Sequence, residues 1–457
     1  MKVNKKMELL GSAPIPKALM ALGIPTMIGM MINALYNLVD AYFVGGLGES
    51  QMGAISIVFP LGQVVVGLGL LFGNGAASYL SRLLGRGDQD TANKVASTAL
   101  YSSVSIGAAV ILLATIFLKP ILRLLGATDT IMPYAITYAR IYVLSSIFNI
   151  FNVTMNNIVT SEGAAKTTMC ALLTGAVLNI GLDPVFIYVL EMGVAGAAIA
   201  TAISQVVSTL VYLAYIFGKK SAFTFSVKAF GPTREMMAEI LKIGVPTLIF
   251  QLLTSLSIAL INRAAKGYGD AVIAGMGAVT RVTSMGTLVV FGFLKGFQPI
   301  AGFSYGAKKF DRLREAIRTS IIWSTAFCVI VGLLMALLST QIVSQFTKGN
   351  AEMISVGQKS LMANGFSFIL FGYYTVYSSL LLALGKGRAG FILGACRQGI
   401  CFVPVILILP AIWGINGILY AQPVADVLSA AITVWMAMRL HKELNAAEKN
   451  VSAPAQE

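Results

Sequence analysis

The sequence predicts an all-α integral membrane protein with twelve transmembrane helices, arranged as two parallel-repeat lobes of six helices each. Three observations support this: the composition, the number of long apolar stretches, and an internal repeat. The 457-residue chain is 57% hydrophobic and only 11% charged, and its mean hydropathy is +0.80. A soluble domain carries about 25% charged residues. This chain therefore lacks the charge to cover a water-exposed surface, and a lipid bilayer replaces that surface.

Each predicted span is an apolar stretch of about 20 residues or more, which is the length that crosses the hydrocarbon layer. The first six lie near 17–45, 52–80, 93–118, 132–160, 166–190 and 194–217. The second six lie near 238–265, 271–303, 313–340, 352–383, 389–412 and 415–440. No small-residue cleavage site follows the first span, so we expect it to be retained and not removed as a signal peptide.

Basic residues are concentrated in the loops on one side of the predicted spans. Twelve spans put both termini and all even-numbered loops on the same side. These segments and their flanks hold 24 of the 33 Lys and Arg residues, counting Arg397 near the start of the span at 389–412. The odd-numbered loops and their flanks hold seven. The positive-inside rule therefore predicts cytoplasmic termini, and the net charge of +14 indicates membrane topology, not nucleic-acid binding.

The two halves of the chain align with each other at a nearly constant register. Pairs separated by 221 residues (246 minus 25) include Pro25 with Pro246, Gly85 with Gly306, and Gly196 with Gly417. Each copy holds six spans, an even number, so both copies enter the membrane in the same direction. We predict an N-terminal lobe over residues 1–222 and a C-terminal lobe with a cytoplasmic tail over 223–457. Lobes that rock about a central cavity would give alternating access.

Two carboxylates lie inside the apolar spans of the first half. Asp40 is late in the first span and Asp183 is in the middle of the fifth, and neither has an evident basic partner in its own half. An ionisable group near the bilayer centre is costly unless it is satisfied, so such groups usually mark functional sites. Asn179 lies one helical turn before Asp183, and Pro184 removes a backbone donor beside it.

Polar stripes run along several helices of the first half. The stripe on the first span has i, i+3, i+4, i+7 spacing and consists of Asn33, Tyr36, Asn37 and Asp40. The fourth span carries Asn149, Asn152, Asn156 and Thr160, and the sixth carries Thr201, Ser204, Gln205 and Ser208. We expect these faces to converge on one cavity. The alternative for any single Asn, Ser or Thr is that it holds neighbouring helices together.

The second half has a different set of charges, because apolar residues occupy the positions equivalent to the two acids. Arg281 and Lys295 lie in the eighth span, and Asp426 lies in the twelfth. Either cation is a candidate partner for Asp426, and an ion pair and a substrate contact are both open. Polar or aromatic residues expected along the cavity in this half include Gln298, Tyr373 and Tyr377.

The sequence argues against enzymatic chemistry. Its four cysteines lie in apolar runs without metal-ligand spacing, and its single histidine, His441, lies in the polar tail. No metalloprotease, nucleophile-elbow or phosphate-loop motif occurs. We therefore expect neither an enzyme nor a cofactor, and nothing resembles the filter loop of a channel.

At these residues the chain resembles the multidrug and toxic compound extrusion (MATE) family, of the MOP type, over about residues 10–440. The segments that carry the resemblance are DAYFVGGLG at 40–48, SRLLG at 81–85, LNIGLDP at 178–184 and GFQPIAG at 296–302. Their order and spacing are similar to those of the MepA-type and DinF-related bacterial branch.

The resemblance implies an antiporter of the bacterial cytoplasmic membrane that exports organic cations, dyes and fluoroquinolone-like drugs in exchange for H⁺ or Na⁺. It places the cation-coupling site at Asp40, Asp183, Asn179, Thr201 and Tyr36, of which the first four would supply the oxygen ligands for Na⁺. The residues expected to line the substrate cavity are Asn33, Asn37, Asn152, Asn156, Gln205, Arg281, Gln298, Tyr373 and Tyr377. An ion site in the second lobe is not expected, and Lys295 would disfavour cationic substrates there.

One rival function uses the same broad architecture. A flippase for lipids or lipid-linked oligosaccharides handles anionic headgroups and needs a strongly basic cavity. The first half is acidic instead, although Arg281 and Lys295 leave some room for that function. We expect a monomer whose partners are small organic molecules and the lipid bilayer. The residues do not distinguish H⁺ from Na⁺ as the coupling ion.

Overall fold

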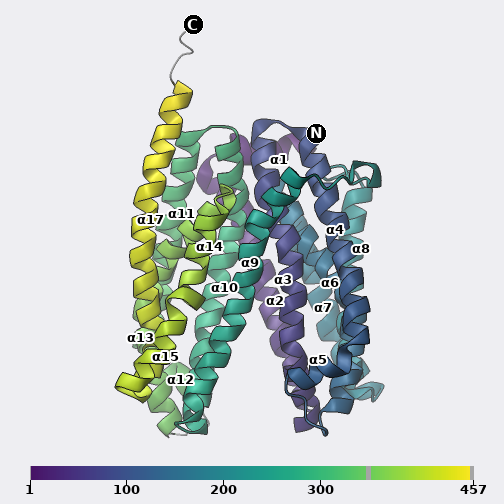
Figure 1. Ribbon diagram of the computed structural model, residues 1–457, viewed down its shortest axis with the longest axis vertical. Coiled ribbons are helices and arrows are strands. Elements are labelled where there is room, and N and C mark those ends of the chain that lie inside the picture. The colour runs from purple at the N-terminus through teal and green to yellow at the C-terminus, as the bar shows by residue number, and fades with distance from the viewer. Residues whose placement is uncertain (1, 346–350, 453–457) are drawn as a thin grey trace.

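The computed structural model describes residues 2–345 and 351–452, and within these ranges it is a bundle of long helices without strands (Figure 1). Eleven of the described helices are long and apolar enough to cross a membrane. The chain is thus a multi-span membrane protein, and eleven of the twelve predicted spans meet both criteria.

The first half begins with α1 (Lys2–Gly11), which precedes the first span. Its spans are α2 (Ile15–Gly45), α3 (Glu49–Arg86), α4 (Gln89–Ile116), α6 (Met132–Ser161), α7 (Ala165–Pro184) and α8 (Gly193–Phe217). The short helix α5 (Leu118–Leu124) lies between α4 and α6. After Pro184, α7 continues as the π-helix η1 (Val185–Val189), as expected where a proline removes one hydrogen bond of the helical ladder.

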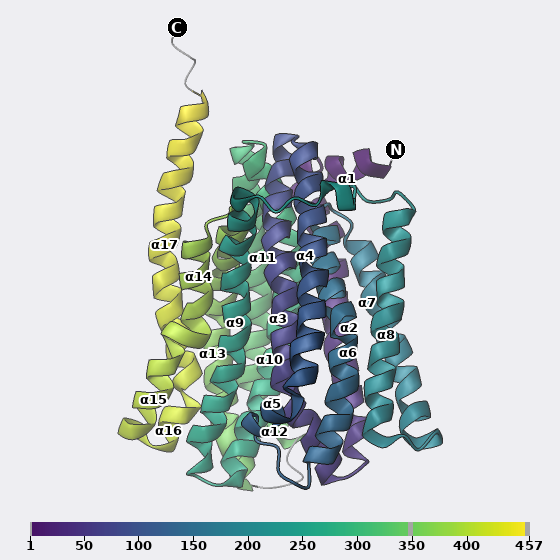
Figure 2. The same ribbon diagram turned by 45° about the vertical axis from the view of Figure 1, so that its right-hand side comes forward.

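The predicted span that lacks sufficient hydropathy is α6. It has 30 residues, which is long enough to cross a bilayer. Its polar residues, Asn149, Asn152, Asn156 and Asn157 among them, lower its hydropathy. In Figures 1 and 2 it runs along the other helices of its lobe. A threshold on mean hydropathy thus misses α6, because its asparagine side chains keep it below the value that the other described spans reach.

The second half repeats the arrangement. Its spans are α9 (Arg234–Lys266), α10 (Asp270–Gly306), α11 (Phe310–Leu337), α13 (Ala351–Ala383), a composite span, and α17 (Ala421–Ser452). The composite span consists of α14 (Gly387–Ala395), the π-helix η3 (Cys396–Ile400) and α15 (Phe402–Trp413). The short elements are η2 (Val227–Ala229), α12 (Ser339–Ser344) and α16 (Ile415–Leu419).

The segment 218–233 links the halves and crosses the same end of the molecule as the N-terminus (Figure 2). We call this end the N-terminal face. Figure 1 shows the helices of the two halves close together at this face and diverging toward the opposite end. The division near residue 222 falls within this connection and stays a prediction.

Cross-lobe contacts hold the halves together at the N-terminal face. The Arg82 guanidinium pairs with Glu239, with 3.0 Å between Nη2 and Oε2. The Asn74 amide donates to the Thr247 hydroxyl at 2.9 Å. Helix α1 also bridges the lobes, because Lys6 pairs with Glu162 at 3.3 Å in the first lobe. At its other end, the Arg312 guanidinium of the second lobe donates to carbonyl oxygens at the end of α1 and just beyond it.

Glycines let the backbones of the two lobes touch. A Cβ added at Gly296 would lie 2.5 Å from the Gly23 nitrogen, and one at Gly306 would lie 2.1 Å from the Arg82 carbonyl oxygen. Both obstacles are backbone atoms, which cannot move aside as a flexible side chain can. This close approach requires glycine on α10.

We expect Gly296→Ala to destabilise this closed arrangement by about 1–3 kcal/mol, the range for overpacking a tight interface. Spin labels on opposite lobes at the N-terminal face should report a larger separation by pulsed electron resonance. Gly277→Ala is the matched control, because it lies on the same helix and a Cβ there meets nothing within 4 Å. Equal distances in the two variants would contradict the packing described here.

Candidate functional site

An acidic cluster occupies the interior of the first lobe. Asp183 is completely buried, and Asn179, one turn earlier on α7, is 1% exposed. The Asn179 amide lies 3.4 Å from the Asp183 carboxylate and 3.4 Å from the hydroxyl of Thr201 on α8. The structure thus brings these three predicted residues together from two helices.

Asp40 joins this cluster from α2. Its carboxylate is within electrostatic range of Asp183, and its Oδ1 atom is buried without a hydrogen-bond partner. Across the described residues, neither acid forms an ion pair with a lysine or arginine. Two neighbouring carboxylates therefore share an apolar lobe without compensating charge.

Unpaired oxygen atoms are the main chemical feature of the cluster. Asp40 Oδ1, Asp183 Oδ2 and Asn179 Oδ1 are all buried and accept no hydrogen bond. A buried polar atom without a partner is costly, and most native structures supply one. Carboxylate and amide oxygens are the ligands that hard metal cations prefer, and a carboxylate can instead take a proton. The cluster can therefore accept a small cation.

Three tyrosines belong to the electrostatic environment of the acids. Tyr36 of α2 is within electrostatic range of both acids. Tyr138 and Tyr142 of α6 belong to the same group, and their rings stack with centroids 6.2 Å apart. Neither of the two α6 tyrosines is among the site residues predicted from the sequence. Their i, i+4 spacing, with Asn149 seven residues after Tyr142, is the pattern that could have indicated a shared face.

The polar stripe of α2 is divided between two environments. Tyr36 and Asp40 are partly buried against the first lobe, whereas Asn33 and Asn37 are exposed. The Asn37 side-chain amide donates to the backbone oxygen of Asn33 at 2.7 Å, so its hydrogen-bond partner lies within its own helix. The four residues keep the helical spacing of one stripe, and its exposed and partly buried members alternate along it.

Amide groups continue the polar interior toward the N-terminal face. The Asn152 amide donates to the backbone oxygen and the side-chain oxygen of Gln205, each at 2.8 Å. One helical turn further, the Asn156 amide donates to the Tyr212 hydroxyl at 3.2 Å. These contacts join α6 to α8 and place the predicted residues Asn152, Asn156 and Gln205 in the same lobe interior.

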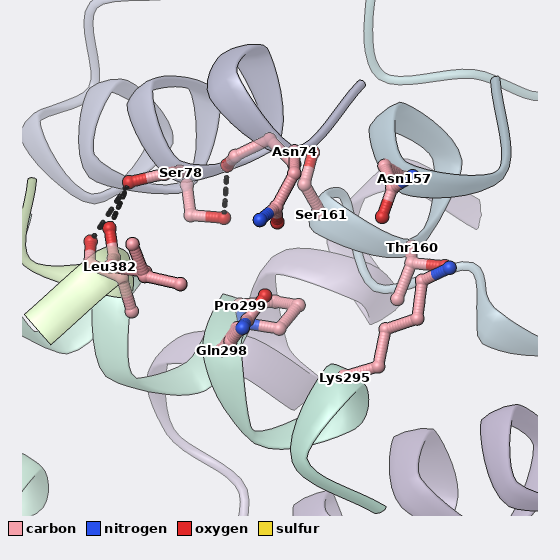
Figure 3. Close-up of a pocket in the computed structure, with 12 residues that line it drawn as sticks. Asn74, Ser78, Asn157, Thr160, Ser161, Lys295, Gln298, Pro299 and Leu382 are labelled. Carbon is pink, nitrogen blue, oxygen red and sulfur yellow. Dashed lines mark hydrogen bonds between the residues drawn. The ribbon is translucent and has the colours of Figure 1, made fainter. Parts of the chain in front are cut away.

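A small polar pocket lies between the lobes near the N-terminal face, where residues of α3 and α6 face residues of α10 and α13 (Figure 3). Its polar lining includes Asn74, Ser78, Asn157, Ser161, Lys295 and Gln298. The Lys295 ammonium donates across the lobes to the Asn156 carbonyl oxygen. Of the cavity residues predicted in the second half, Gln298 is the one that lines this pocket.

The partner of Asp426 is neither Arg281 nor Lys295, so both pairings proposed from the sequence are wrong. Arg397 of η3 pairs with Asp426, with 2.9 Å between Nε and Oδ1. Counting Arg397 with the loops was also wrong, because its side chain is 8% exposed inside the lobe. Arg397 lies close to the start of the predicted span, but the burial of its side chain depends on packing against α13 and α17.

Asp426 is further satisfied within its own lobe. The Ser367 hydroxyl and the Gln422 amide each donate to it at 2.8 Å, and the Arg397 guanidinium lies 4.5 Å from the Phe371 ring centroid. This group has its charges balanced, unlike the acidic cluster of the first lobe. We therefore interpret it as a structural ion pair.

The other predicted cavity residues of the second half lie apart from the Lys295 pocket. Arg281 is exposed on α10. Tyr373 lines an apolar groove formed by α11, α13 and α17. Tyr377 is buried beside it, and its hydroxyl contacts His441 of α17 at 2.9 Å. His441, which the sequence analysis assigned to the tail, therefore packs against α13 as part of a continuous α17.

Comparisons with known proteins agree with this architecture. The MatE family matches residues 25–185 and 246–408. Multidrug export protein MepA of Staphylococcus aureus (strain MRSA252) is 30% identical over 439 residues, which cover 94% of this chain and 95% of MepA. The two matched segments begin at Pro25 and Pro246, the register of the internal repeat.

Solved structures are similar over almost the full length. One is described as the outward-facing conformation of a multidrug resistance MATE family transporter of the MOP superfamily. It gives a TM-score of 0.91 at 28% identity, covering 97% of this chain and 99% of that chain. A MOP superfamily transporter from Pyrococcus furiosus gives a TM-score of 0.90 at 28% identity, with coverage of 96% and 99%. That protein is described as having a binding pocket of reverse polarity that suggests a different function.

Proposed function

Because the chain belongs to the MATE family of membrane transporters, we propose that it is a multidrug efflux antiporter that exchanges H⁺ or Na⁺ for bulky organic molecules, mostly cations. Its relatives are export proteins and transporters rather than enzymes. The name of MepA, a multidrug export protein, supports the substrate class.

The observation that carries the proposal is the uncompensated acidic cluster. Asp40 and Asp183 interact electrostatically within the first lobe, and each has a buried oxygen atom without a partner. When both are ionised, the lobe needs a cation. A small ion from outside or a cationic drug from the cytoplasm can meet that need. If the states that hold them compete, binding of one favours release of the other.

The membrane potential drives this exchange when more positive charge enters than leaves, as when two ions, one for each acid, enter for one monovalent drug cation. A potential of about 100 mV then supplies roughly 2.3 kcal/mol for each net elementary charge that crosses the membrane. That energy corresponds to a concentration ratio of about fiftyfold, since about 1.4 kcal/mol is a factor of ten. Proton or sodium gradients add to it. No further energy source is needed for efflux against a moderate gradient.

The arrangement of the lobes supports alternating access. The positive-inside distribution places the N-terminal face in the cytoplasm, where the cross-lobe contacts of Arg82 and Asn74 lie. The opposite end, where the halves diverge, would then face the exterior (Figure 1). We infer that the conformation is outward-facing, as is the similar solved transporter. Rocking of the lobes would break these contacts and open the cytoplasmic side.

Ethidium efflux from loaded cells that express the chain tests the proposed energy source. An uncoupler should stop efflux within minutes, because it collapses the ion gradient. Depletion of ATP with the membrane potential maintained by respiration should leave efflux unchanged. Efflux that follows ATP and ignores the uncoupler would contradict ion coupling. Transport of labelled lipids without ethidium efflux would favour the flippase, the rival function for which Arg281 and Lys295 leave room.

A further inference from the structure

We propose that Lys295 and the polar groups around it form an anion-binding subsite, which takes the carboxylate of zwitterionic or acidic organic substrates. The proposal rests on the export function above and specifies a part of its substrate range. It concerns the pocket between the lobes, not the acidic cluster inside the first lobe.

The position of Lys295 calls for a partner. It lies on α10 eleven residues before Gly306, which places it about 16 Å from the N-terminal end of the bundle. The side chain is partly buried, and it forms no ion pair with any residue that the structure describes. A lysine at membrane depth is costly unless it is neutralised, so it is a functional feature by default.

The present partner of Lys295 is a neutral one. Its ammonium donates to the Asn156 carbonyl oxygen, which carries a dipole and no net charge. A lysine has three donors, so this contact leaves others unused. A carboxylate would add a full negative charge to this hydrogen bond, and the attraction between opposite charges is what the neutral amide oxygen lacks. Lys295 therefore stands to gain from an anionic ligand.

The remaining lining suits the second oxygen of a carboxylate. The Gln298 side chain forms no hydrogen bond within the described ranges, and it lies one turn after Lys295 on the same helix. Figure 3 shows Asn74 of α3 facing Gln298 and Pro299 across the pocket. The Asn74 amide uses one donor on Thr247 and retains a second. An organic cation would meet a like charge at this place.

A ligand can enter the subsite only after a conformational change, because the lobes are in contact at the N-terminal face. The pocket now has a free volume of about 10 Å³, on the order of one water molecule. Lys295 belongs to the second lobe and Asn156 to the first, so their contact exists only when the lobes meet at the N-terminal face. When the lobes separate there, Lys295 loses Asn156 and can bind a carboxylate that enters from that side.

Closure then helps to release the substrate. As the lobes approach, the Asn156 oxygen returns to Lys295 and competes with the carboxylate of the substrate. The pocket also shrinks, which leaves the substrate the open side of the molecule as its exit. The exchange of a carboxylate for an amide thus links substrate release to the movement of the lobes.

A pair of ligands that differ only in the carboxylate tests the subsite. We would measure equilibrium binding to the purified protein, and transport into proteoliposomes, of a zwitterionic fluoroquinolone and of its methyl ester. Lys295→Gln should weaken binding of the acid by about tenfold or more, the loss expected for a charged hydrogen bond. It should leave binding of the ester within about twofold. Lys359→Gln, an exposed lysine of the same lobe, is the matched control.

A Lys295→Arg variant separates the charge from the contact with Asn156. It should retain the preference for the acid, because arginine keeps the positive charge. If Lys295→Gln weakened binding of the acid and the ester equally, Lys295 would only hold the lobes together, and the proposal would be overturned. Unchanged binding of the acid in this variant would also overturn it. If the wild-type protein bound the acid through Lys295 but exported neither ligand, the subsite would stand and the export function would fail.

Discussion

Replacing Asp183 by asparagine is expected to abolish active export of organic cations while leaving the protein folded. The substitution keeps the shape of the side chain and removes its charge. Without that charge the first lobe no longer requires a cation, so ion movement and drug movement lose their link. With two ions entering for each ethidium exported, one net charge crosses the membrane, so loss of coupling should lower the accumulation ratio for ethidium by up to about fiftyfold at about 100 mV.

Ethidium efflux measured at matched expression checks this prediction. Asp40→Asn should also lower ethidium efflux. Asp129→Asn is the control, because Asp129 is an exposed acid in the connection between α5 and α6. Undiminished efflux in Asp183→Asn at normal expression would remove the acid from the mechanism. A loss shared equally by Asp129→Asn would indicate a general effect of altered charge instead.

The second large effect is expected at Arg397, and it concerns stability. Its side chain is 8% exposed and that of Asp426 is 4% exposed. Removal of one partner from a buried pair leaves the other charge uncompensated, which costs about 3–5 kcal/mol. We therefore expect Arg397→Met to lower the thermal midpoint of the purified protein by several degrees and to reduce its yield.

The double variant Arg397→Met with Asp426→Leu should recover most of that stability. Replacing a buried ion pair by apolar residues of similar volume is often neutral or stabilising. Lys359→Met, which removes an exposed charge from the same lobe, should change the midpoint little. If single and double variants melted at the same low temperature, the stabilising role of the pair would be refuted.

The architecture could be predicted from the sequence because hydrophobic length and repeat register are local properties. The spans and the repeat follow from runs of about 20 apolar residues and from pairs such as Pro25 and Pro246. The family was indicated by the resemblance of segments such as LNIGLDP at 178–184. The internal location of Asp40 and Asp183 follows from the same runs. Helical periodicity predicted that the polar faces of these helices converge, and in the structure the two carboxylates interact electrostatically.

Features that depend on packing between helices could not be predicted in this way. The depth of Arg397 depends on how the composite span packs beside α17, so the sequence suggested the wrong partner for Asp426. The contact between Lys295 and Asn156 crosses the lobes and depends on the conformation. Tyr373 has helical spacing that fits a cavity, but its helix turns that side toward an apolar groove. Helical periodicity in the sequence predicts which residues share one face of a helix. Which neighbouring helix, cavity or groove that face packs against depends on the fold.

Ion release upon drug binding is the most direct test of cation exchange at the two acids. Purified protein in weakly buffered solution is titrated with ethidium while pH is recorded, and displacement of radioactive Na⁺ is measured in parallel. We predict that the wild-type protein releases protons or sodium as it binds the drug, and that Asp183→Asn binds without release. Binding of ethidium with neither ion displaced from the wild-type protein would contradict the exchange mechanism.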